Sequence, residues 1–182
     1  MHYANLETYL REAETTSSSV LPIPVVARWM NVTPPAVRAM LRRGVLERVS
    51  IGSVTFVSVL SLKQWHAALE AEVKKVIKLL QKAARKGRPI SYGDLLAKLG
   101  RSFTKPADRR RLGPVLEAAS KRGLLEYGVL LGVWAFSKTT DLPKYGVWDL
   151  ADAHRLRKEG EGMHAFVAAQ REASTGMFQK GG

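Results

Sequence analysis

The most informative absence in this 182-residue sequence is cysteine. Without thiols the chain cannot form disulfides, thiolate zinc sites or cysteine nucleophiles. Long apolar runs are absent too, since no stretch approaches the roughly 20 residues that cross a bilayer. Residues 1–13 alternate charged and apolar side chains without the apolar core of a signal peptide. These absences predict a soluble, cytoplasmic protein.

Groups that support catalysis or metal binding are sparse. The four histidines lie far apart, and none has the spacing of a metal ligand set. Glu70, Glu72 and Lys74 superficially resemble a nuclease carboxylate and lysine set, but alternate residues on a helix point to different faces. No glycine-rich phosphate loop is present. The sequence therefore predicts a protein that is not an enzyme and has no metal site or cofactor, with metal-dependent cleavage as the alternative.

What the sequence does contain is basic charge, most of it in the middle. The net charge is +13 and the pI is about 10.3. Residues 74–122 hold fifteen Lys and Arg against three acids, a net charge of +12, whereas the flanking segments are close to neutral. Charge this concentrated destabilises a compact state unless a polyanion offsets it, so nucleic acid is the expected partner. No membrane partner is predicted, because the basic stretch is not the polar face of one amphipathic helix.

Hydrophobic spacing divides the chain into four parts. They are an N-terminal helix and linker (1–19), a compact module (20–70), a second, basic module (71–150) and a C-terminal helical tail (151–182). A helical pattern over 62–86 connects the modules, either as one helix or as two that meet near Ala71. The tail is expected to contain helices over 149–157 and 163–173, with disorder from Ser174.

The first module has the order of elements of a known DNA-binding fold. A helix over 24–30 and a turn at 31–33 precede a second helix over 34–43, capped by Thr33 and ended by Gly44. Two β-branched strands over 45–51 and 54–59 then flank a tight turn at Gly52 and Ser53. This order resembles the winged helix-turn-helix of the excisionase and MerR type, with 58–65 in place of the closing helix.

The resemblance implies that the second helix enters the major groove and that the wing touches the DNA backbone. Val37, Met40 and Leu41 would face the core. Pro35 departs from the family's pattern, because directly after Pro34 it leaves no polar side chain at an early position where base contacts are usual. A winged helix used for dimerisation is the alternative. The DNA-binding residues expected in this module are Thr33, Arg38, Arg42, Arg43 and Ser53.

The second module carries a shorter resemblance. Its segments 91–100, with Tyr92-Gly93, and 109–116, with Arg111-Leu112-Gly113, are similar to the winged helix of alkylguanine-DNA alkyltransferases and their alkyltransferase-like relatives. Alkyl transfer itself is excluded, because the chain has no cysteine nucleophile. The residue pattern predicts a helix over 106–122, ended by Gly123, and two short strands within the Val- and Leu-rich segment 124–136 that turn near Gly128 or Gly132. The resemblance implies that this helix faces DNA.

Basic residues gather where this helix begins. Cations at a helix N-terminus cost stability through the macrodipole, so a bound phosphate is an easier explanation than a structural need, with a solvated basic face as the alternative. The expected DNA-binding residues are Arg101, Lys105, Arg109, Arg110 and Arg111. A further stripe for the DNA backbone, or for solvent alone, is predicted on the preceding helix: Lys74, Lys75, Lys78, Lys82, Arg85 and Lys86.

Together these observations predict an α+β, mainly helical protein with two tandem winged helix-turn-helix modules and a helical connector. Its expected function is double-stranded DNA binding in the nucleoid, as a transcriptional regulator or as an accessory factor of a mobile element. An RNA-binding or ribosome-associated protein is the alternative. The apolar stripe of the helix over 4–14 predicts a homodimer through that helix, or else packing onto the first module. The four tryptophans are expected in the core.

Overall fold

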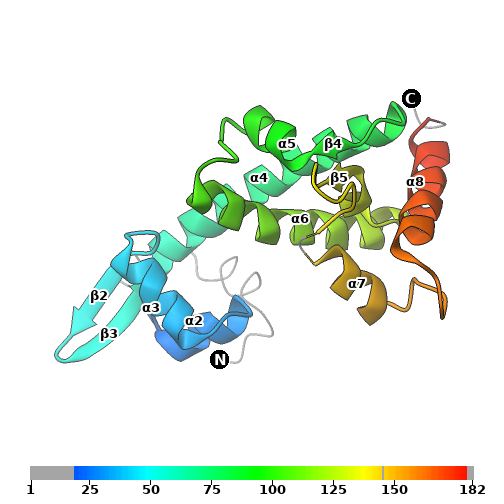
Figure 1. Ribbon diagram of the computed structural model, residues 1–182. Coiled ribbons are helices and arrows are strands. Elements are labelled where there is room, and N and C mark those ends of the chain that lie inside the picture. Colours follow the sequence, from blue (N-terminus) through cyan, green and yellow to red (C-terminus); the bar gives the residue numbers. More distant parts are fainter. Residues whose placement is uncertain (1–18, 145, 180–182) are drawn as a thin grey trace. The chain divides into compact units, whose positions relative to one another are not determined.

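The computed structural model describes residues 19–144 and 146–179, which form helices and two small sheets (Figure 1). The class is α+β and mainly helical, as predicted. Two compact units follow one another along the chain, residues 1–69 and residues 70–182. The predicted helix over 4–14 lies outside the described residues.

The first unit begins with the predicted pair of helices. Helix α2 (Ile23–Trp29) has Pro24 in its first turn, and Asn31, with φ of 53°, turns the chain after it. Helix α3 (Pro34–Arg42) follows Thr33, whose Oγ1 accepts a hydrogen bond from the Ala36 N–H at 3.4 Å. Thr33 is therefore the cap that the sequence predicted: the Ala36 N–H in the first turn donates to the Thr33 backbone carbonyl at 2.9 Å and to its side chain.

A three-stranded antiparallel sheet completes the first unit. Strands β2 (Arg48–Ile51) and β3 (Val54–Ser58) form the predicted hairpin, with Gly52 at φ of +60° in the turn. Strand β1 (Val20–Pro22), which the sequence did not predict, pairs with the other edge of β3, so the order is β1-β3-β2. Three residues ending in proline are too short to show an alternating pattern, which explains why β1 was missed.

One apolar cluster joins these elements. Val26 from α2, Val37 from α3 and Val57 from β3 are completely buried. Partly buried side chains pack against this cluster, among them the predicted core residues of α3 and two tryptophans: Met40, Leu41, Trp29 and Trp65. Burying one aliphatic side chain contributes roughly 1.5–3 kcal/mol. The cluster therefore fixes α3 and the hairpin relative to each other.

The connecting segment is one 27-residue helix, α4 (Val59–Arg85), so the choice that the sequence left open between one helix and two is resolved. Leu62 near its start is buried in the core of the first unit, whereas Val73, Val76 and Leu80 are completely buried further along it. The six cations of the predicted stripe on this helix are all exposed.

The second unit places its helices around a very short parallel sheet. Strand β4 (Ile90–Ser91) pairs with β5 (Ala135–Phe136), and α5 (Tyr92–Lys98) begins directly after β4 with Ser91 as its N-cap, as predicted. The other elements are α6 (Pro106–Tyr127), the 3-10 helix η1 (Leu131–Trp134), α7 (Val147–Ala153) and α8 (Met163–Gln179). Trp134 is buried as predicted, and Trp148 is half-buried.

The prediction of two strands within 124–136 is wrong, because only Ala135–Phe136 forms a strand there. The chain instead continues α6 to Tyr127, and β5 runs parallel to β4 rather than forming a hairpin. Gly123, which was expected to end the helix, is buried inside it, and a Cβ there would lie 2.6 Å from Cγ of Leu131. The helix ends at Gly128, which has φ of +68°. Over its described residues, the second unit therefore has the helix pair α5 and α6 but no wing.

The prediction of disorder from Ser174 is also wrong for residues 174–179, because α8 continues to Gln179. The Ser174 side chain is buried, and its hydroxyl accepts a hydrogen bond from Nε1 of Trp134 at 2.8 Å. The same hydroxyl donates to the Gln170 carbonyl at 2.7 Å. A single serine thus provides the polar partner that a buried tryptophan N–H requires.

Candidate nucleic-acid interface

Helix α3 presents its cations to solvent, as the sequence predicted. Arg38, Arg42 and Arg43 are exposed, and so are Thr33 at the start of the helix and Ser53 in the hairpin turn. The Nε of Arg43 donates to the carbonyl of Ala39 at 3.1 Å, which directs this side chain back along its own helix. Arg38 and Arg42, one turn apart on the helix, therefore lie on the same exposed face.

The structure adds a residue that the sequence analysis missed. A hollow of about 490 Å³ lies between α3 and the hairpin, and Arg38 and Arg42 line it together with Arg48 of β2. The remaining lining residues are Ile23, Leu41 and Thr55. Three arginines from two elements thus line one hollow. The alternation of β2 could have indicated Arg48, since the hairpin buries one face and exposes the other.

The electrostatics of this module are strongly one-sided. Residues 19–69 contain a single acid, Glu47, and six basic residues: Arg28, Arg38, Arg42, Arg43, Arg48 and Lys63. Within the described part of the chain, none of the three arginines that line the hollow forms an ion pair with a carboxylate. Among the described residues of this module, positive charge therefore predominates near the hollow.

The arginines expected to bind DNA in the second unit have partners within the protein. Glu72 of α4 accepts hydrogen bonds from Nε of Arg101 at 2.8 Å and from Nε of Arg111 at 2.9 Å. Arg101 also contacts Oδ1 of Asp108 at 3.2 Å. Arg101 and Arg111 therefore have a structural role that the sequence did not predict, and their contact with DNA stays a prediction. Their acidic partner lies on another helix and could not be found from local sequence.

Asp108 stabilises the same turn from the other side. Its Oδ2 accepts a hydrogen bond from the backbone N–H of Ser102 at 2.9 Å. This bond, helped by Arg101, lowers the pKa of the Asp108 carboxyl below its ordinary value. The carboxylate also lies in the first turn of α6, where the macrodipole favours negative charge. The turn between α5 and α6 is thus held by charge on both sides.

The other predicted cations of this turn project further. Lys105 and Arg110 are exposed. Arg109 is half-buried: its Nη1 donates to the carbonyl of Phe103 at 3.1 Å, and its guanidinium lies 5.6 Å from the centre of the Phe103 ring. The structure therefore divides the predicted cluster into two anchored arginines and three cations that face outward to different degrees.

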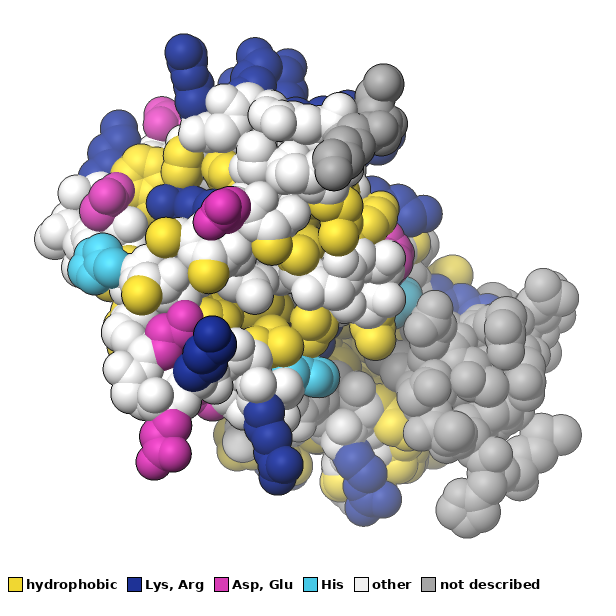
Figure 2. All heavy atoms as spheres, turned by 90° about the vertical axis from the view of Figure 1, so that its right-hand side faces the viewer, with side chains coloured by type: hydrophobic (Ala, Val, Ile, Leu, Met, Phe, Trp, Pro, Cys, Tyr) yellow, Lys and Arg dark blue, Asp and Glu magenta, His cyan; other side chains and the backbone are white. Residues whose placement is uncertain are grey.

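The described C-terminal part of the chain offers no comparable concentration of positive charge. Figure 2 looks at the side of the molecule on which α7 and α8 lie, and shows acidic, basic and apolar side chains interspersed there. In residues 123–182 the seven basic residues are matched by seven acids. We therefore take the α3 and hairpin surface as the candidate site, with Lys105 and Arg110 as secondary candidates.

Comparison of the chain with models of protein families, with curated proteins and with solved structures gives no match. Among the described residues, no helix combines the length and the apolar composition needed to cross a membrane. The same part of the chain contains no group of three or more His, Asp or Glu residues arranged to hold a metal ion. The function has to be inferred from the geometry of the candidate site.

Proposed function

We propose that this protein binds double-stranded DNA, with α3 in the major groove and the β2–β3 hairpin against the backbone. The observation that carries the proposal is the convergence of Arg38, Arg42 and Arg48 on one hollow between α3 and the hairpin. The major groove of B-DNA admits one α-helix, and arginine is the commonest residue to read guanine there. A hairpin beside the helix then has phosphates within its reach.

The first residues of α3 restrict which of its side chains can contact base edges. Pro34 and Pro35 open the helix, and the Oγ1 of Thr33 is engaged with the Ala36 amide. The polar side chains that remain on the exposed face begin at Arg38. We therefore assign base contacts to Arg38 and Arg42 and a phosphate contact to Arg48, whose Nε lies 3.2 Å from the hydroxyl of Ser50.

The biological role that fits this interface is transcriptional regulation or assistance to a mobile element. Both roles require sequence preference on duplex DNA, which the two α3 arginines would supply, together with non-specific affinity from the net charge of +13. Dimerisation through the helix predicted over 4–14 would match a two-fold operator and remains a prediction. A preference for structured RNA over duplex DNA at matched salt would contradict the proposal.

The test is a charge-matched comparison on the full chain. Arg38, Arg42 and Arg48 are replaced together by Ala, and in a control variant three exposed lysines of the second unit, Lys138, Lys144 and Lys158, are replaced by Ala. Both variants lose the same charge. We expect the arginine variant to lose at least about tenfold in affinity for duplex DNA and to flatten the slope of log affinity against log salt by about 0.9 per lost contact. Equal losses in the two variants would contradict the assignment.

A further inference from the structure

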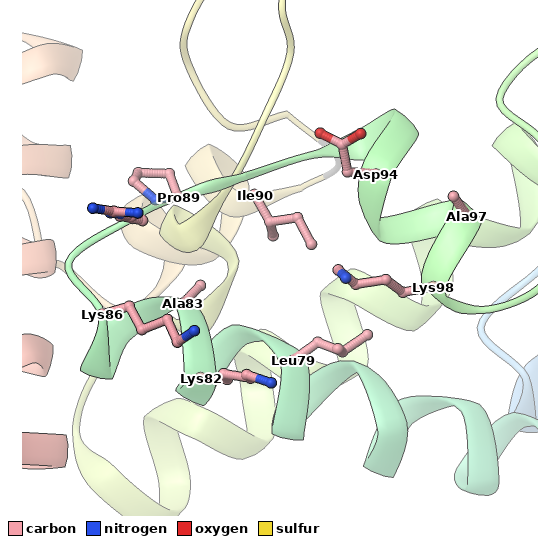
Figure 3. Close-up of a pocket in the computed structure, with 10 residues that line it drawn as sticks. Leu79, Lys82, Ala83, Lys86, Pro89, Ile90, Asp94, Ala97 and Lys98 are labelled. Carbon is pink, nitrogen blue, oxygen red and sulfur yellow. The ribbon is translucent and has the colours of Figure 1, made fainter.

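A second hollow lies within the second unit, between α4 and α5, and has a volume of about 690 Å³ (Figure 3). Its floor is aliphatic and comes from three consecutive pieces of the chain. Leu79 and Ala83 belong to α4, Pro89 and Ile90 to the segment that leads into β4, and Ala97 to α5. Leu79, Pro89 and Ile90 are only partly buried, so apolar surface remains open to a partner.

Cations surround this floor. Figure 3 shows Lys82 on α4 and Lys86 just after its end on one side of the hollow, and Lys98 on α5 on the other, with aliphatic side chains between them. Arg88 lines it as a fourth cation, and all four are exposed. None of the four forms an ion pair with a carboxylate of the described residues. The one acid in the lining, Asp94, accepts a hydrogen bond from the Ser91 hydroxyl at 2.6 Å as part of the α5 cap.

The lining argues against nucleic acid as the occupant. A duplex presents a broad convex surface, lined by phosphates, that cannot enter a hollow of this size. Single strands enter grooves, but their binding usually relies on aromatic side chains on which the bases stack. None of the described residues that line the hollow is aromatic. Four cations around aliphatic side chains instead match a chain that carries carboxylates and apolar side chains together.

We propose that this hollow, the α4–α5 groove, binds an acidic amphipathic peptide segment of a partner protein. Apolar side chains of the segment would lie on Leu79, Ala83 and Ile90, and its carboxylates would pair with Lys82, Lys86 and Lys98. This is the helix-in-groove mode of recognition, in which spaced apolar anchors give affinity and the charged rim gives orientation. The proposal does not depend on DNA binding by the first unit.

The test titrates the full-length protein with three probes. The first is a synthetic peptide of about 14 residues with Leu at helical i, i+3, i+4 and i+7 spacing and Glu at most other positions. The second has the same composition in an order without an apolar face. The third is a poly-dT oligonucleotide of equal charge. Binding is followed by fluorescence anisotropy and by NMR shifts of the methyl groups of Leu79 and Ile90.

We expect the amphipathic peptide to bind with a dissociation constant below about 100 μM, and the other two at least tenfold more weakly. Replacing Lys82 and Lys98 by Glu should weaken peptide binding at least tenfold, whereas Lys74→Glu with Lys78→Glu, exposed positions outside the lining, should have a much smaller effect. Ala97→Arg separates binding in the groove from attraction by charge alone. The arginine side chain would fill the groove and add a positive charge, so peptide binding should weaken if the peptide lies in the groove. If charge alone attracted the peptide, binding should strengthen.

Three results would overturn the proposal. They are saturable binding of the oligonucleotide in the groove at the peptide's affinity, equal binding of both peptides, and no binding of the amphipathic peptide below about 1 mM. Duplex DNA binding is measured on the same groove variants. Loss of peptide binding with DNA affinity retained in the groove variants, and the reverse in the α3 variants, would show that the two sites act separately, so either proposal can fail without the other.

Discussion

Glu72 on α4 and Arg111 on α6 are 39 residues apart in the sequence, and their side chains form an ion pair at 2.9 Å. The same carboxylate accepts a hydrogen bond from Arg101 at 2.8 Å. The side chain of Glu72 is only 11% exposed, so this is a network partly removed from water rather than a surface pair. Glu72 thus connects α4 both to the turn that follows α5, through Arg101, and to the second turn of α6, through Arg111.

Replacing Glu72 by Gln should destabilise the protein. The isosteric amide keeps the shape but leaves Arg101 and Arg111 without their shared counter-charge. We expect the free energy of unfolding to fall by about 1–2 kcal/mol, which is less than the cost of breaking a fully buried ion pair and more than the cost of breaking an exposed one. The measurement is urea unfolding at constant ionic strength.

The matched control is Glu117→Gln. Glu117 also pairs with a cation, Lys121 at 2.7 Å, but both of these side chains are about half exposed. Such i,i+4 surface pairs contribute roughly 0.3–0.5 kcal/mol. If the two variants lose the same stability, the Glu72 network has no special structural role.

The second prediction separates four of the five cations near the start of α6 by function. Arg101→Ala with Arg111→Ala should lower the unfolding free energy and leave the salt slope of DNA binding unchanged, because both arginines are engaged with Glu72. Lys105→Ala with Arg110→Ala should leave stability within about 0.5 kcal/mol of the parent, because both side chains are exposed.

DNA binding provides the second readout. If Lys105 and Arg110 contact phosphates, their removal should flatten the salt slope by up to about 0.9 for each contact and weaken all sequences alike. An unchanged slope would exclude Lys105 and Arg110 from the DNA interface. Both double variants lose two positive charges, so each serves as the charge control for the other.

Local signals explain why the first unit was largely predictable. Thr33 before Pro34, Gly44 after two arginines and Gly52-Ser53 between β-branched runs each fix a boundary within a few residues, and the structure has the corresponding elements at these places. The exposure of Arg38 and Arg42 was predicted because helical spacing places them on a different face of the helix from Val37 and Leu41. Arg48 was missed because its relation to α3 depends on how the hairpin packs.

The second unit was less predictable because its long-range contacts override local patterns. Gly123 and the Val- and Leu-rich stretch after it are typical of a helix end and a strand, but the glycine is where η1 approaches α6. The ion pairs of Arg101 and Arg111 were missed for the same reason, because their partner Glu72 lies on another helix and is distant in sequence. Sequence spacing shows which residues share a helix face and does not show which residues of other helices they meet.

The third prediction concerns acid. The Ser102 amide, with Arg101, holds the pKa of the Asp108 carboxyl below its ordinary value of 3.8, because both interactions favour the charged form. A carboxyl with a lowered pKa stabilises the fold above its ordinary pKa, and that contribution is lost as the pH falls through the lowered value. Asp108→Asn removes the contribution at every pH.

The measurement is urea unfolding of the parent and of Asp108→Asn between about pH 7 and about pH 3. The stability difference between them should be constant above about pH 5 and should shrink below pH 4 as Asp108 of the parent becomes protonated. Glu126→Gln, at an exposed position, is the control for the loss of one carboxylate. A difference that grows as the pH falls would contradict the assigned direction.

The last prediction tests why α6 continues through Gly123. A Cβ at this position would lie 2.6 Å from Cγ of Leu131 and 3.0 Å from the carbonyl oxygen of Val129, so alanine must push η1 away from the helix. Such overpacking costs about 1–3 kcal/mol. At Gly176 in α8, by contrast, an added Cβ meets nothing within 4 Å, and alanine should stabilise the helix by up to about 1 kcal/mol. The two glycine-to-alanine changes are chemically identical. Changes in the unfolding free energy of opposite sign would therefore show that the close approach of residues 129–131, and not helix propensity, requires glycine at position 123. Stabilisation by both changes would mean that η1 can move without cost.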